Sequence, residues 1–103
     1  MKLIINNKIY DIEMYISPFK KLKGFMFSKR IDKIICFPRC RSIHTFFMRR
    51  PIGVIYLDKG LNVMKIINSL NKNRISYCKN AYYVIECNTE LLKNNSSIKI
   101  TRN

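Results

Sequence analysis

The side chains best suited to binding chemistry gather around the single histidine of this 103-residue chain. Arg39 and Arg41 precede His44, and Arg49 and Arg50 follow it, so all five fall within twelve positions. A guanidinium group binds a carboxylate or phosphate through two parallel hydrogen bonds, and imidazole adds a donor whose charge changes near neutral pH. We therefore expect an anion-binding site at one end of a sheet. The alternative is four solvated arginines around a histidine with a purely structural role.

Catalytic patterns are weak in this sequence. A Ser-His-acid or Cys-His arrangement would have to use His44, and neither a Gly-x-Ser-x-Gly elbow nor a catalytic-cysteine signature accompanies it. The six acidic residues form no pair with active-site features, and three glycines cannot build a phosphate-binding loop. We expect no catalytic residues and no cofactor, and a hydrolase that depends on His44 is the enzymatic alternative.

A zinc site is suggested by spacing alone. Cys36, Cys40 and His44 are each four residues apart, and Cys78 could supply a fourth ligand. A spacing of four brings side chains together on a helix, whereas Pro38 makes this segment extended or looped. We therefore expect no metal site, and we expect Cys36 and Cys87, which fall in apolar strands, to be core residues.

The chain is strongly basic, with 20 Lys and Arg against 6 Asp and Glu and a net charge of +14. Such a field attracts phosphates, anionic lipid headgroups and acidic proteins. The abundance of Lys, Asn and Ile is typical of AT-rich genomes, so codon bias could explain part of the charge. Phe46, Phe47 and Met48 lie beside the arginines, which suggests bases stacking on rings. Because Phe46 and Met48 would share one face of a strand, core packing is the simpler expectation for them.

No apolar run approaches the roughly 18 residues that span a bilayer, and the start of the chain becomes polar too early for a signal peptide. Four irregularly placed cysteines do not indicate a disulfide-rich scaffold. We therefore expect a cytoplasmic protein. Its length leaves room for one domain, residues 1–103, and its 48% apolar residues are enough for a globular core.

The elements that position these residues begin with a hairpin. It is predicted from the apolar stretch Lys2–Ile5, the turn Asn6–Lys8 and the alternating stretch Ile9–Ile16. In the last stretch, every second side chain is apolar and would share one face: Tyr10, Ile12, Met14 and Ile16. Ser17 and Pro18 then predict a short helix over about 18–24, ending at Gly24, with its apolar stripe in the core.

The other elements are predicted from short apolar runs. The expected strands are 33–37, 43–48, 52–57, 61–70, 82–87 and 98–101, with a reversal at 58–60, a polar linker at 71–80, a helical turn from Asn88 and a turn at 94–97. Ile43–Met48 is expected to be extended, with its large side chains inward and the flanking guanidiniums at one rim. About seven strands and one or two short helices favour a mainly β fold, a small jelly-roll-like sandwich or partly open barrel.

The stretch from Cys40 to Asp58, CRSIHTFFMRRPIGVIYLD, resembles the bacterial and archaeal family known as domain of unknown function 192. Many members carry a signature close to S-I-H-T-F-x-M-R-x-P-I-D-V-x-F-L-D. KGFMF and IICFP are similar to the family's R-G-L-M-G and G-M-L-F blocks, and NAYYVIECNTELLKNNSSIKI is similar to its A-x-Y-V-L-E-L segment, short helix and final strand. The resemblance covers about residues 17–100. It implies a compact, jelly-roll-like β-sandwich with a short helix, and it implies no agreed biochemical function.

The sequence departs from the family pattern at three places. Gly53 replaces the usual acid after Pro-Ile, Arg50 replaces an aromatic residue or Asn, and Thr101-Arg102-Asn103 replaces Gly-Asp. If that acid serves a site in relatives, the site is altered here. Cys40 and Cys78 lie in matching places of the family pattern, so the resemblance implies a contact between them, as a disulfide or a thiol pair according to the compartment.

Two functional hypotheses follow. The first is a non-catalytic accessory or ligand-binding module that presents Arg39, Arg41, His44, Arg49 and Arg50 to an anionic partner, either a protein carboxylate surface or a small anion. The second is non-specific nucleic-acid binding driven by the net charge.

Overall fold

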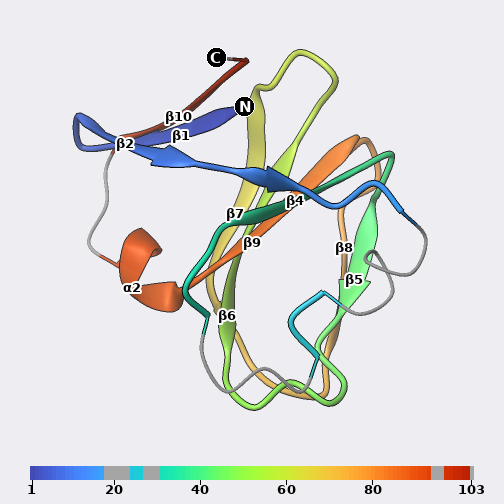
Figure 1. Cartoon of the computed structure of the whole chain (residues 1–103). Coiled ribbons are helices and arrows are strands. Elements are labelled where there is room, and N and C mark those ends of the chain that lie inside the picture. The colour runs from blue at the N-terminus through green and yellow to red at the C-terminus, as the bar shows by residue number, and fades with distance from the viewer. Residues whose placement is uncertain (18–23, 27–30, 94–96, 103) are drawn as a thin grey trace.

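A computed structural model describes residues 1–17, 24–26, 31–93 and 97–102 (Figure 1). Its elements are β1 (Lys2–Ile5), β2 (Lys8–Asp11), β3 (Glu13–Met14), β4 (Ile35–Pro38), β5 (Ser42–His44), β6 (Ile52–Leu57), β7 (Val63–Leu70), β8 (Ile75–Tyr77), β9 (Tyr83–Cys87), α2 (Thr89–Leu92) and β10 (Ile98–Thr101). The predicted mainly β class is confirmed. In these described ranges, no helix has the length and apolar character needed to cross a membrane.

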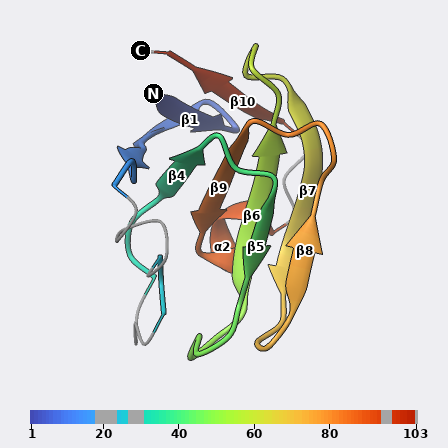
Figure 2. The ribbon, with the colours of Figure 1, turned by 90° about the vertical axis from the view of Figure 1, so that its right-hand side faces the viewer.

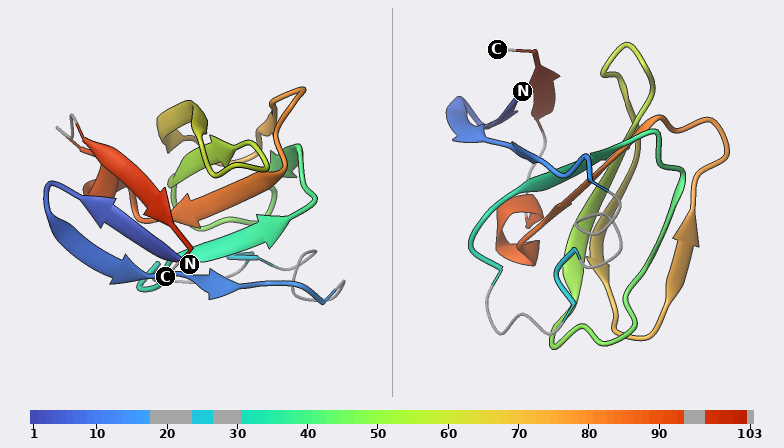
Figure 3. Two further views of the ribbon diagram at one scale, coloured as in Figure 1. Left: turned by 90° about the horizontal axis from the view of Figure 1, so that it is seen from above. Right: turned by 45° about the vertical axis from the view of Figure 1, so that its right-hand side comes forward.

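The strands form three open sheets rather than a closed barrel. The central sheet has the order β3-β4-β9-β6-β7, a second has the order β10-β1-β2, and β5 pairs with β8. Seen from above in Figure 3, β1, β2 and β10 lie side by side and run at an angle to the strands of the central sheet. Figures 1 and 2 place β5 and β8 on the opposite side of the molecule from α2.

Both faces of β4, β6 and β9 in the central sheet are buried, which explains why these three strands are nearly continuous apolar runs. All six residues of β6 are buried, and they alternate between two core clusters. The first cluster includes Val54 and Tyr56 and is covered by Ile43 of β5. The second includes Ile55 and Leu57 and is covered by residues of β1 and α2.

The N-terminal hairpin is confirmed, but the strand predicted over Ile9–Ile16 is not continuous. Asn6 and Asn7 make the turn with φ values of 48° and 68°, the left-handed geometry that asparagine tolerates. The chain changes partners at Ile12, whose N–H donates to the carbonyl of Met1 before Glu13 N–H bonds to Ile34. The stretch is therefore split into β2 and β3, which belong to different sheets, and Ile16 is exposed instead of sharing the buried face.

The prediction that Ile43–Met48 is wholly extended is wrong. The strand β5 ends at His44, and a tight turn follows in which Met48 N–H donates to the Thr45 carbonyl and Phe47 has φ 64°. Buried Thr45 fixes this turn, because its hydroxyl donates to the Asn71 carbonyl and accepts from Arg74 N–H. Met48 is buried as expected, whereas Phe46 and Phe47 are 39% and 62% exposed.

The predicted linker 71–80 contains a further strand, β8, which pairs antiparallel with β5. Its only buried side chain is Ser76, whose hydroxyl lies 2.8 Å from that of Tyr56. Ile75 and Tyr77 point outward and are exposed, so the segment lacks the apolar inward face that identifies a strand in a sequence.

Turns and the helix follow the sequence in part. The helical turn after Asn88 is confirmed as α2, and the Asn88 side chain caps it by accepting from Glu90 N–H. The reversal after β6 extends to Asn62, and Leu61 takes the positive φ of 68° while Asp58 accepts hydrogen bonds from Gly60 and Asn62. The helix predicted over 18–24 lies outside the described residues except for Gly24, and the turn predicted at 94–97 does so except for Ser97.

Candidate functional site

The predicted anion-binding arginines flank β5 at its two ends. Arg39 and Arg41 lie in the connection from β4, and Arg49 and Arg50 lie in the connection to β6 (Figure 2). All four are exposed. The two pairs are thus separated by β5 and the turn after it, so they line an elongated surface instead of meeting around one point.

His44 lies between the two arginine pairs, and its ring is held by Phe46. The Nδ1 atom of His44 accepts a hydrogen bond of 3.2 Å from Phe46 N–H, and the two rings stack with centroids 5.3 Å apart. Because Nδ1 accepts, the neutral imidazole carries its proton on Nε2. The group that His44 can offer to a ligand is therefore the Nε2 donor.

The pairing of β5 with β8 adds residues that the sequence did not indicate. Ser42 pairs with Tyr77 and His44 with Ile75, whereas the intervening pair Ile43 and Ser76 is buried. Ile75 and Tyr77 are 70% and 53% exposed. We name the outer side of β5–β8 together with Arg39, Arg41, Arg49 and Arg50 the basic face. Ile75 and Tyr77 were missed because β8 lies in a polar stretch.

The four cysteines divide between the two faces of the central sheet. Cys36 and Cys87 are buried in the second cluster, where burial raises the pKa of each thiol to about 12, so both are core residues as predicted. Cys40 and Cys78 pack against the first cluster near the end of the β5–β8 pair, where Cys40 Sγ donates to the Ser42 carbonyl and Cys78 N–H donates to the Arg41 carbonyl. Their pairing stays a prediction. Over the residues that the structure describes, no three His, Cys, Asp or Glu side chains are grouped to hold a metal ion.

Glu86 is a buried acid in the centre of the sheet. Its register partners are Ile35 on β4 and Val54 on β6, and the side chain is 3% exposed. Among the described residues, its Oε1 atom has no hydrogen-bond partner, and burial raises the pKa of the carboxyl to about 8. A single acid inside the apolar stretch Tyr82–Cys87 is the sequence signal that identifies it.

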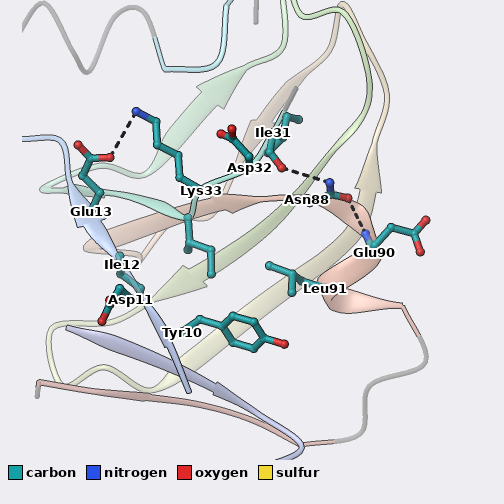
Figure 4. A pocket seen from close by; sticks show the side chains of 11 residues that line it. Tyr10, Asp11, Ile12, Glu13, Ile31, Asp32, Lys33, Asn88, Glu90 and Leu91 are labelled. Atoms are coloured by element: carbon teal, nitrogen blue, oxygen red, sulfur yellow. Dashed lines mark hydrogen bonds and ion pairs between the residues drawn. The ribbon is translucent and has the colours of Figure 1, made fainter. Parts of the chain in front are cut away.

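A pocket of about 620 Å³ lies beside α2 (Figure 4), and Figure 1 shows α2 on the side of the molecule away from β5 and β8. Its apolar lining comes from the β2–β3 stretch, the segment 31–34 and α2: Tyr10, Ile12, Ile31, Ile34 and Leu91. Its polar lining contains four of the chain's six acidic residues, with one lysine and one asparagine: Asp11, Glu13, Asp32, Glu90, Lys33 and Asn88. The sequence did not indicate this pocket, because its lining comes from three separate segments.

Asn88 joins two walls of this pocket. Its Nδ2 donates to the Ile31 carbonyl over 3.2 Å, and its Oδ1 accepts from Glu90 N–H over 2.9 Å, as the dashed lines in Figure 4 show. On the opposite side, Lys33 forms an ion pair of 3.4 Å with Glu13. The segment 31–34 is thus tied to α2 at one end and to β3 at the other.

Two solved structures share this fold. A "putative transcription regulator" from Sinorhizobium meliloti 1021 matches with a TM-score of 0.76 and 16% identity over 89% of this chain and 81% of that chain. A protein of unknown function from Novosphingobium aromaticivorans DSM 12444 matches with a TM-score of 0.71 and 14% identity over 96% of this chain and 84% of that chain. Identities this low establish similarity of fold alone.

No curated protein matches the chain. The model of the family DUF192, described as "Uncharacterized ACR", matches residues 1–100, which is nearly the whole sequence and extends the predicted region of resemblance to the N-terminal hairpin. The motifs around His44 and Glu86, the mainly β architecture and this match agree with one another. The chain therefore belongs to the DUF192 family.

Proposed function

We propose that the protein is a non-catalytic binding module whose basic face binds an anionic partner. The observation that carries this proposal is the exposure of all four arginines in the connections at the two ends of β5. Two pairs of guanidinium groups, one at each end of a strand, suit a partner that presents several carboxylates or phosphates in a row. His44 would add one donor, Nε2, between them.

Single-stranded nucleic acid is the second candidate, and it is favoured by exposed rings on the β5–β8 pair and in the turn after β5. Tyr77 and Phe47 are more than half exposed, and the Phe46 ring stacks on His44 beside the ladder. Bases stack on such rings whatever their sequence, while flanking arginines bind the phosphates. An acidic protein surface would use the arginines without the rings.

A binding experiment tests the location of the site. Fluorescence anisotropy would follow two labelled probes of about twelve units each, an oligothymidylate and a polyglutamate peptide, between about 50 and 200 mM NaCl. We expect the variant Arg41→Ala/Arg49→Ala to weaken binding of the preferred probe about tenfold and to reduce the slope of log affinity against log salt by about 2.

The matched control is Lys8→Ala/Lys99→Ala, which removes the same charge from exposed positions on β2 and β10. Equal losses in the two double variants would mean that net charge alone attracts the probes, and the basic face would lose its role. Tyr77→Ser separates the two partners. Loss of a stacked base costs roughly 1–3 kcal/mol of binding to the oligonucleotide, and binding of polyglutamate should not change.

A further inference from the structure

We propose that the pocket beside α2 binds a small aliphatic amine, a ligand with an ammonium group and an apolar chain. This site is separate from the basic face and takes a ligand of the opposite charge. Its volume of about 620 Å³ lies within the range of roughly 300–1,000 Å³ that is usual for small-molecule sites.

The charge of the pocket is the first part of the case. In a chain of net charge +14, four of the six acidic residues line this one hollow. Two of them have cationic partners, since Asp11 pairs with Lys2 and Glu13 pairs with Lys33. Within the described ranges, Asp32 and Glu90 have no ion-pair partner, so two exposed carboxylates are available to a cation.

The lysine in the lining does not cancel this charge. Lys33 Nζ is bound to Glu13 and lies 5.4 Å from the centre of the Tyr15 ring. Figure 4 shows its side chain extending toward Glu13, while Asp32 and Glu90 lie on two different walls, the segment 31–34 and α2. The two available carboxylates therefore belong to different parts of the pocket rim.

The apolar lining is the second part of the case. Ile12 and Ile34 are members of the second core cluster, and Tyr10 and Leu91 pack against it while still lining the pocket. Tyr10 comes from β2 and Leu91 from α2, so the apolar lining joins two elements. A methylene chain bound between these side chains would be removed from water, which favours binding. An inorganic cation has no apolar surface to bury and gains nothing from this lining. The pairing of an apolar lining with acidic residues therefore selects an organic cation.

The experiment uses α,ω-diaminooctane as the probe, with octanediol and α,ω-diaminobutane as comparison compounds. Isothermal titration calorimetry near pH 7 should detect saturable binding of diaminooctane. We expect binding at least about tenfold weaker for octanediol, which lacks the charge, and for diaminobutane, which lacks four methylene groups. Backbone amide NMR shifts should change at Ile34 and Leu91 and remain constant along β8.

The variant Asp32→Asn/Glu90→Gln removes both available carboxylates with almost no change of volume. It should weaken binding of diaminooctane at least about tenfold, since the ammonium groups lose their partners. Asp58→Asn, which removes a carboxylate from the β6–β7 turn, is the control and should bind like the unchanged protein. Absence of saturable binding, equal affinity for octanediol, or unchanged affinity in the double variant would each overturn the proposal.

Discussion

Glu86 has the side chain whose chemistry conflicts most with its surroundings. A carboxyl group on a central strand lies among Ile35, Val54 and Phe37, and Gly24 approaches so closely that a methyl group there would lie 3.4 Å from Oε1. Removing a charged carboxylate from water without a partner is costly, so the proton is retained and the pKa rises to about 8. The acid therefore links the stability of the first core cluster to pH.

The pH dependence has a defined sign. An unfolded glutamate has a pKa of about 4.3, so between pH 4.3 and about 8 the unfolded chain gives up a proton that folded Glu86 keeps. The free energy of unfolding should thus be highest below this window and fall as pH rises, by at most about 1.4 kcal/mol per pH unit. Glu86→Gln cannot titrate and should flatten this slope.

Urea unfolding at a series of pH values from 5 to 8, for the protein and for Glu86→Gln, measures the difference. Glu13→Gln, which alters an exposed acid on β3, should keep the slope. Parallel stability curves for the protein and for Glu86→Gln would show that Glu86 ionises in the folded state as it does in the unfolded chain.

At the scale of elements, α2 explains one departure from the family pattern. Leu92 is 1% exposed and sits over Gly53 of β6, where a Cβ atom would lie 2.7 Å from Leu92 Cδ1 and 3.2 Å from Cys87 Sγ. An acid at position 53 would bring a carboxylate into the same apolar space. Gly53 is therefore the residue that lets α2 pack on β6 in this chain.

Gly53→Ala should lower the free energy of unfolding by about 1–3 kcal/mol, because Leu92 has to move within a filled core. In Gly53→Ala/Leu92→Ala the added methyl group enters the space that the leucine leaves, so the combined cost should be less than the sum of the single costs. Gly60→Ala, in the exposed turn after β6, is the control and should change stability far less. Additive losses in thermal or urea unfolding would contradict the contact.

The sequence was informative wherever an element identifies itself by its own residues. The runs that became β4, β6 and β9 are apolar because they are buried, and Asn88 marks the start of α2 by its capping chemistry. The sequence did not show which strands and turns contact each other. The break at Ile12, the turn after His44 and the strand β8 depend on contacts with Met1, Arg74 and β5, which are distant in the sequence.

For the candidate sites too, some features could be predicted from the sequence and others could not. The arginines of the basic face could be named from composition and spacing, because exposed basic residues need no particular neighbour. Their separation by β5, the presence of Tyr77 beside them and the pocket around Asp32 and Glu90 arise only when separate segments meet. Short-range sequence patterns contain no information on such tertiary contacts.

At the scale of the whole molecule, charge is unevenly distributed and poorly compensated. Only Lys2–Asp11 and Lys33–Glu13 form ion pairs among the described residues, against a net charge of +14. Like charges repel more strongly in the compact state than in the extended chain, and salt screens this repulsion. We expect the melting temperature to rise by a few degrees between about 10 mM and 500 mM NaCl.

Differential scanning calorimetry at constant pH checks this expectation. A variant with three exposed lysines changed to glutamate, Lys8→Glu/Lys59→Glu/Lys99→Glu, should show a smaller rise because it has less repulsion to screen. A melting temperature that falls with added NaCl would mean that attractive pairs outweigh the repulsion.

The pairing of β1 with β10 has a consequence for synthesis on the ribosome. Lys2 faces Thr101 across this ladder, so nearly a hundred further residues must be translated after β1 before that edge of the strand is covered. Until then, β1 presents a row of unpaired amides and carbonyls that another nascent chain could use. Slow translation of the codons between β1 and β10 would lengthen this interval, because the three-stranded sheet can be completed only after β10 has been made.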